Sequence, residues 1–144
     1  MKGWFLFAAI ILMTACSGNA PEEDDKISLS SDKDYAAKQT ELNAAIKEMN
    51  IPLEKWNGFM QRAKQGQPIL SEDFDFTYAE FLPKADAVKK KTKEIKAYLS
   101  SNGQKLTESG IDVNQERHRL EAIEADVEKN INSMKAELNS MSQQ

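Results

Sequence analysis

A seven-residue spacing of apolar side chains is the feature that most constrains the fold of this 144-residue chain. One row with this spacing is Tyr35, Leu42, Met49, Trp56 and Ala63, and a companion row, offset by four residues, is Ile46, Leu53 and Met60. At about 3.6 residues per turn, the two rows form one apolar stripe along a helix. The rows keep their register across Pro52, so we predict one helix over residues 32–65, kinked at this proline. Asp32 or Asp34 is expected to cap its start, and Gly66 is expected to end it.

The same spacing recurs after residue 70. The rows are Phe74, Phe81, Val88 and Ile95, accompanied by Tyr78, Ala85, Thr92 and Leu99. They predict a second helix, with Ser71 as its N-cap and Asn102-Gly103 as its end. Pro83 lies inside this stretch and is expected to kink the helix or to break it. Residues 74–78 also alternate apolar and polar side chains as a strand does, but a short segment without a partner strand does not form a sheet.

A third stripe begins after the loop that we predict at residues 104–111. Its main row is Val113, Leu120, Val127, Met134 and Met141, with Ile131 and Leu138 beside it. Asp112 followed by Gln115 resembles a capping box at the start of a helix. Arg117 and Glu124 occupy the earlier positions of the companion row. The stripe is therefore narrower there, and we expect the third helix to pack most loosely near this loop.

Three stripes of similar length, joined by short connections, predict an all-α fold. We expect an antiparallel up-down-up three-helix bundle with long helices, of which the first two are kinked or broken at Pro52 and Pro83. Complete breaks would give a variant with four shorter helices. The helical bundle domain is predicted to span residues 32–144.

The amino end has the pattern of a secretory signal peptide. Lys2 precedes a run of apolar and small residues from position 4 to position 15. Wound as a helix, this run spans about 18 Å at ~1.5 Å per residue, whereas crossing the hydrocarbon core of a bilayer takes about 30 Å. The charged start and the short apolar run therefore predict a signal peptide over residues 1–15 rather than a permanent membrane span.

Cys16, the single cysteine of the chain, directly follows this run. The stretch Met13-Thr14-Ala15-Cys16 resembles the lipobox of bacterial lipoproteins, although that family usually has leucine where this chain has methionine. The resemblance implies that Cys16 receives diacylglycerol and fatty chains such as palmitate, and that these chains anchor the protein to a membrane. An unpaired thiol in an oxidising compartment would otherwise be a liability. The alternative, an ordinary signal-peptidase cut after Ala20, is disfavoured by Pro21.

The residues after Cys16 predict a tether and a destination. Residues 16–31 contain Pro, Gly, Ser and the acidic run 22–25 but few large apolar side chains, so we expect the lipidated cysteine to be followed by a disordered acidic tether. In the lipoprotein family, aspartate after the lipidated cysteine retains the protein at the inner membrane. This chain has Ser17 there, so the resemblance favours the outer membrane, facing the periplasm.

The chain is poor in groups that carry catalysis. Its one histidine, His118, lies between Arg117 and Arg119 on the expected solvent side of the third helix. No paired nucleophile and base, glycine-rich phosphate loop or cysteine–histidine ligand set accompanies it. The net charge of −4 and the predicted export both speak against nucleic-acid binding. We therefore expect a protein that is not an enzyme and has no catalytic residue, metal or cofactor.

A basic run at residues 89–96 is the strongest charged feature of the surface. Lys89, Lys90 and Lys93 are candidates for contact with an acidic partner. The alternative is intramolecular, with Ile95 packed opposite Leu120. That register sets Lys91 opposite Glu124, so the third helix would neutralise much of the run.

Two aromatic side chains, Phe59 and Phe76, fall outside the apolar rows. They are the aromatic candidates for contact with a partner. Methionines 49, 60, 134 and 141 lie on the rows, so we interpret them as core residues rather than as the lining of a ligand groove.

These features together predict a function class. We expect a membrane-anchored envelope lipoprotein whose helical domain acts as an interaction, adaptor or inhibitor module for another envelope protein. The alternative is a periplasmic lipoprotein that binds a lipid or a small apolar ligand between its helices. A ligand cavity near Pro52 and Pro83 would favour the alternative, and a filled core with an exposed aromatic patch would favour the interaction module.

Overall fold

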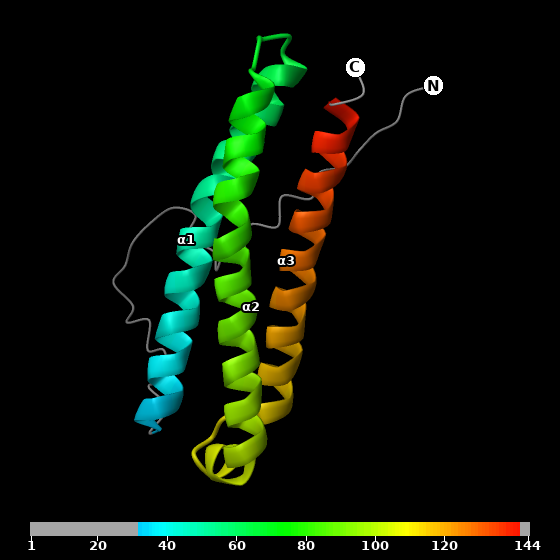
Figure 1. The fold of residues 1–144 in the computed structure, drawn as a ribbon. Coiled ribbons are helices and arrows are strands. Elements are labelled where there is room, and N and C mark those ends of the chain that lie inside the picture. The colour runs from blue at the N-terminus through cyan, green and yellow to red at the C-terminus, as the bar shows by residue number, and fades with distance from the viewer. Residues whose placement is uncertain (1–31, 142–144) are drawn as a thin grey trace, which may run out of the picture.

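The computed structural model describes residues 32–141, which form three helices, the connections between them and the residue that precedes the first helix. The helices are α1 (Lys33–Lys64), α2 (Ser71–Glu108) and α3 (Val113–Met141). They pack side by side, with α2 between α1 and α3 (Figure 1). This part of the chain contains no strand, so the all-α prediction is confirmed. The predicted signal peptide, Cys16 and the acidic tether lie outside the described residues.

Both internal prolines lie within continuous helices. α1 runs through Pro52 and α2 runs through Pro83, so the described residues form three helices and not the variant of four. Two ion pairs join α1 to α2 around these prolines, from Lys55 to Glu80 at 4.0 Å and from Glu48 to Lys84 at 3.8 Å. The alternating residues 74–78 are helical, because they pack as the second turn of α2 rather than against a strand.

α1 begins and ends close to where the sequence predicts. The Oδ1 atom of Asp32 accepts a hydrogen bond from the backbone N–H of Tyr35 at 3.0 Å, so Asp32 is the N-cap. At the other end, Gly66 has a φ of 74°. Its N–H donates to the carbonyl of Ala63, and the N–H of Gln67 donates to the carbonyl of Arg62. This is the Schellman pattern, in which glycine is favoured because it adopts positive φ without strain.

α2 differs from the prediction at both ends. Its N-cap is Leu70, which makes no side-chain capping bond, and Ser71 is the first helical residue. The predicted end at Asn102-Gly103 is wrong, because α2 continues to Glu108. Leu106, seven residues after Leu99, is fully buried and extends the apolar row. The helix ends instead with a second Schellman pattern, in which Gly110 has a φ of 85°.

α3 starts at the predicted cap. The Oδ1 atom of Asp112 accepts hydrogen bonds from the backbone N–H groups of Asn114 and Gln115 at 3.0 and 2.9 Å. Val113 and Met141, the first and last residues of the helix, are only half-buried, whereas the positions between them on the same row are buried. The packing of α3 is therefore weakest at its two ends.

The core lies along α2, which contacts both other helices. The buried apolar side chains are Tyr35, Leu42, Met49, Trp56 and Phe59 on α1, Phe74, Phe81, Ala85, Val88, Ile95, Leu99 and Leu106 on α2, and Leu120, Ile123, Val127 and Met134 on α3. The companion rows of α1 and α3 are only half-buried. No Cα atom of α1 lies within 8 Å of a Cα atom of α3. The three helices thus share one core, but α1 and α3 meet less closely than either meets α2.

None of these three helices offers the long apolar stretch that is needed to cross a bilayer.

Candidate interaction surfaces

Phe76 is the most exposed large apolar side chain of the described residues, with 68% of its surface accessible. It lies in the second turn of α2, and the Nζ atom of Lys55 on α1 lies 5.4 Å from the centre of its ring. Ile51, which is 53% exposed, lies one helical turn before Lys55 on the same side of α1. We call Phe76, Lys55 and Ile51 the Phe76 surface. The sequence-based expectation that Phe76 lies off the stripe agrees with its exposure.

The other aromatic candidate, Phe59, is buried, so the expectation that it is available to a partner is wrong. Its ring packs edge-on against Phe74, with centroids 5.5 Å apart, and Trp56 packs against Phe74 in the same way at 4.9 Å. Phe59 follows Trp56 by three residues, which places the two side chains on neighbouring turns of one helix face. The core stripe of α1 is therefore wider at this end than the seven-residue rows indicate.

Most lysines of the basic run are neutralised by neighbouring helices. Lys89 pairs with Glu128 of α3 at 2.5 Å, and this hydrogen bond raises the pKa of Lys89. Lys91 lies opposite Glu41 of α1, at 2.6 Å, and not opposite Glu124 as the sequence predicted. Residue 91 projects from the flank of α2 that faces α1. Its hydrogen bond to Glu41 raises the pKa of Lys91.

Glu124 instead joins α3 to two other side chains of α2. It pairs with Lys96 at 2.5 Å, and its Oε1 atom lies 2.9 Å from the hydroxyl of the buried Thr92. Burial raises the pKa of Glu124, but the hydrogen bonds from Lys96 and Thr92 outweigh it and hold the pKa below its ordinary value. These contacts lie within about one helical turn of the register that pairs Ile95 with Leu120.

Two lysines of the run, Lys90 and Lys93, are exposed and have no ion pair within residues 32–141. Lys93 borders a shallow hollow of about 430 Å³ between α2 and α3. The hollow is lined by Lys89, Lys93, Glu121, Glu124, Ala125 and Glu128. The lining therefore carries charges of both signs and is not a basic patch. Within the basic run, only Lys90 and Lys93 are lysines without an ion pair in the described residues.

A first polar cluster fastens the start of α1 to the end of α2. Asp32 accepts hydrogen bonds from the Nζ atom of Lys105 at 2.7 Å and from the hydroxyl of Tyr98 at 2.9 Å. The bond from Lys105 is the largest of the effects that lower the pKa of Asp32 from 3.8 to about 2, followed by the backbone N–H of Tyr35 and by Tyr98. The residue predicted only as a helix cap is thus also a contact between helices.

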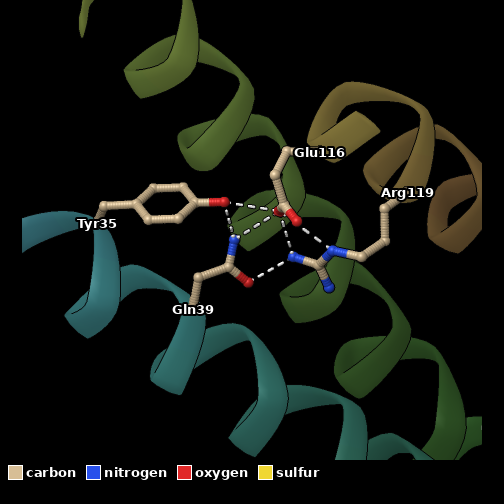
Figure 2. A network of polar contacts seen from close by, with 4 residues as sticks. All are labelled: Tyr35, Gln39, Glu116 and Arg119. Carbon is tan, nitrogen blue, oxygen red and sulfur yellow. Dashed lines mark hydrogen bonds and ion pairs between the residues drawn. The ribbon is translucent and has the colours of Figure 1, made fainter. Parts of the chain in front are cut away.

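A second polar cluster joins α1 to α3. Figure 2 shows Tyr35 and Gln39 of α1 reaching towards Glu116 and Arg119 of α3. Glu116 accepts hydrogen bonds from the hydroxyl of Tyr35 at 2.6 Å, from Gln39 at 3.0 Å and from Arg119 at 2.9 Å. Arg119 also donates to the side-chain carbonyl of Gln39. The Oε2 atom of Glu116 and the side-chain amide of Gln39 thus link the two helices.

The titration of this second cluster follows from its contacts. Burial raises the pKa of Glu116, but hydrogen bonds from Arg119 and Tyr35 outweigh it and keep the pKa below its ordinary value. Burial and the adjacent carboxylate raise the pKa of Tyr35. Both groups therefore keep their ordinary charge near neutral pH, and the cluster acts as a structural contact between helices.

Acid is expected to weaken the first cluster. Because folding lowers the pKa of Asp32 from 3.8 to about 2, its charge stabilises the folded state fully above the unfolded pKa, and this contribution is lost as the pH falls towards about 2. Asp32→Asn keeps a capping oxygen and removes the charge. We expect it to lower the melting temperature at pH 6 and to have a smaller effect at pH 2.5, as measured by circular dichroism. An equal effect at both pH values would contradict this assignment.

The described residues place no recognisable reactive group at these surfaces. The side chain of His118 is 82% exposed, and its Nδ1 atom lies 3.5 Å from Glu121. Residues 32–141 contain no group of three or more histidine or acidic side chains arranged to hold a metal ion. The groups that these surfaces expose to a partner are the ring of Phe76, the nearby side chain of Ile51 and the two lysines Lys90 and Lys93.

No family model, no curated protein and no solved structure matches this chain.

Proposed function

We propose that this chain is a bacterial envelope lipoprotein, anchored through lipids on Cys16, whose helical domain docks on another envelope protein as an adaptor or inhibitor. The observation that carries the docking function is the Phe76 surface, which exposes an aromatic ring beside Lys55 and Ile51. Aromatic side chains contribute much of the binding energy at protein interfaces. The lipobox resemblance of residues 13–16 supports the anchor, and Ser17 supports the outer membrane.

The proposed architecture is up-down-up, and contacts between helix ends support it. The start of α1 contacts the end of α2 through Asp32 and Lys105, and it contacts the start of α3 through Tyr35 and Glu116 (Figure 1). Bends at Pro52 and Pro83 would lie between the two ion pairs that join α1 to α2. In this arrangement Phe76 is at the far end of α1 from the tether. The 32 residues of α1 span roughly 48 Å.

The docking proposal predicts a large effect of one substitution. A photo-crosslinking residue at position 76 is expected to capture the envelope partner, and one at the exposed Ala122 of α3 is not. With the captured protein purified, Phe76→Ala should weaken binding by about 30-fold, as the loss of an interface hot spot does. Binding can be measured by calorimetry. Lys129→Ala serves as the control because it removes an exposed side chain of α3. Equal affinities of the wild type and Phe76→Ala would refute the proposed surface.

The second candidate function is binding of a lipid or small apolar ligand. Its support is the half-buried companion rows of α1 and α3, which include Met60 and Leu138. Against it, the hollow between α2 and α3 is lined mainly by charged residues, and every buried side-chain nitrogen and oxygen in the described part has a hydrogen-bond partner. Mass spectrometry of the non-lipidated Cys16→Ser protein under native conditions separates the two functions. A stoichiometric lipid that survives purification would favour ligand binding.

A further inference from the structure

The contacts between the helices are unequal, and the weakest lie between α1 and α3. Both helices pack closely on α2, but no Cα atom of α1 lies within 8 Å of one of α3. The rows that α2 contributes to the core are buried apart from Tyr78, whereas the companion rows of α1 and α3 are half-buried. We call the junction between α1 and α3 the seam.

Within residues 32–141, long side chains make hydrogen bonds across the seam in two places. One is the network of Tyr35 and Gln39 with Glu116 and Arg119 (Figure 2). The other is a single bond of 2.8 Å, in which the indole N–H of Trp56 donates to the Oε2 atom of Glu137. Between Gln39 and Trp56, α1 advances by about 25 Å. The seam is thus held by polar contacts near each end.

Polar contacts of this kind are weaker ties than a closely packed apolar interface. A hydrogen bond contributes about 1 kcal/mol net, because water replaces the partner when the bond breaks. By contrast, each large side chain of α2 that leaves the core loses about 1.5–3 kcal/mol of burial. Parting α3 from α1 breaks these bonds and uncovers side chains that are only half-buried, whereas parting either helix from α2 also uncovers buried ones. We therefore expect the first separation to cost less free energy.

We propose that the bundle opens along the seam: α3 moves away from α1 while it stays packed on α2. The opening breaks both polar contacts together, since both are carried by the one continuous helix α3. It exposes the half-buried rows, which include Leu53 and Met60 on α1 and Ile131 and Leu138 on α3. This opening is a property of the fold and does not depend on the Phe76 surface or on the lipid anchor.

Trp56 provides a direct measure of the opening. In the full-length chain with Trp4→Phe, it is the only tryptophan, so its indole N–H gives one resonance. The exchange rate of this proton with solvent deuterium reports how often the bond to Glu137 is broken. The backbone amide of Ile95, in the centre of α2, reports unfolding of the whole bundle.

The decisive variant lies at the other end of the seam. Glu116→Ala removes the acceptor shared by Tyr35, Gln39 and Arg119 and does not contact Trp56. We expect indole exchange of Trp56 to accelerate roughly tenfold, the effect of losing one to two net hydrogen bonds. Exchange of the Ile95 amide should change much less. Tyr35→Phe, which deletes only a hydroxyl, should act in the same direction with a smaller effect.

Glu128→Ala is the matched control, because it removes an ion pair between α2 and α3 instead. We expect it to leave the exchange of the Trp56 indole nearly unchanged. Two results would overturn the proposal. One is indole exchange that does not respond to Glu116→Ala, and the other is indole exchange that accelerates only in step with the Ile95 amide.

Discussion

Phe81→Ala is expected to destabilise the helical domain by about 3–5 kcal/mol, the usual cost of truncating a buried phenylalanine. Phe81 is 0% exposed and lies on α2, the helix that both others pack against. The substitution leaves a cavity in the shared core, because the surrounding side chains can relax only partly into the space that the ring occupied. Urea unfolding followed by circular dichroism measures the change in the free energy of unfolding.

Phe76→Ala is the matched control for this prediction, since it makes the same chemical change five residues earlier on the same helix. Because Phe76 is 68% exposed, we expect its truncation to change the free energy of unfolding by only about 0.5 kcal/mol. The same variant is expected to bind the partner about 30-fold more weakly. Similar destabilisation by both substitutions would contradict the packing described for α2.

Cys16→Ser is expected to abolish the lipid anchor. Each buried methylene of a fatty chain contributes about 0.8 kcal/mol, so two or three chains make attachment effectively permanent. Serine lacks the thiol that the lipid requires. The variant should therefore accumulate as an unprocessed precursor without the mass of the lipid, as mass spectrometry of the intact protein measures. Ser17→Ala, which leaves the thiol in place, should be lipidated normally. Normal maturation of Cys16→Ser would refute the lipobox assignment.

The seven-residue rows predicted the three helices because a buried stripe is a strong and repeated signal. Asp112 was recognisable as a cap because it precedes such a stripe, and Asp32 was one of two candidates, with Asp34, for the same reason. The end of α2 was predicted too early, since Asn102-Gly103 is a common stop signal. The continuation of the row to Leu106, which is fully buried, was the stronger signal. Burial of one more leucine outweighs the modest cost of a glycine inside a helix.

The surfaces were less predictable than the helices. Phe59 and Phe76 both fall outside the seven-residue rows, so periodicity does not distinguish them. In the structure Phe59 packs against Phe74 and is buried, whereas Phe76 is exposed. Lys91 was assigned to the wrong neighbour because a sequence shows which side chains share a face but not the angle between helices. The two polar clusters were missed for the same reason. Tyr35 and Gln39 lie one turn apart on α1, as do Glu116 and Arg119 on α3. Polar pairs with this spacing beside an apolar stripe are the sequence feature that could have indicated the second cluster.

The clasp of Asp32 by Lys105 and Tyr98 has a mechanical consequence. A pulling force applied through the chain that precedes residue 32 would act at once on the start of α1 and on the C-terminal end of α2. A pull directed along α1 would then load its long contact with α2 in shear, so that many side chains resist at once, rather than peeling the helix away turn by turn. A domain held at this point would withstand drag from a bound protein better than one attached through a frayed helix start.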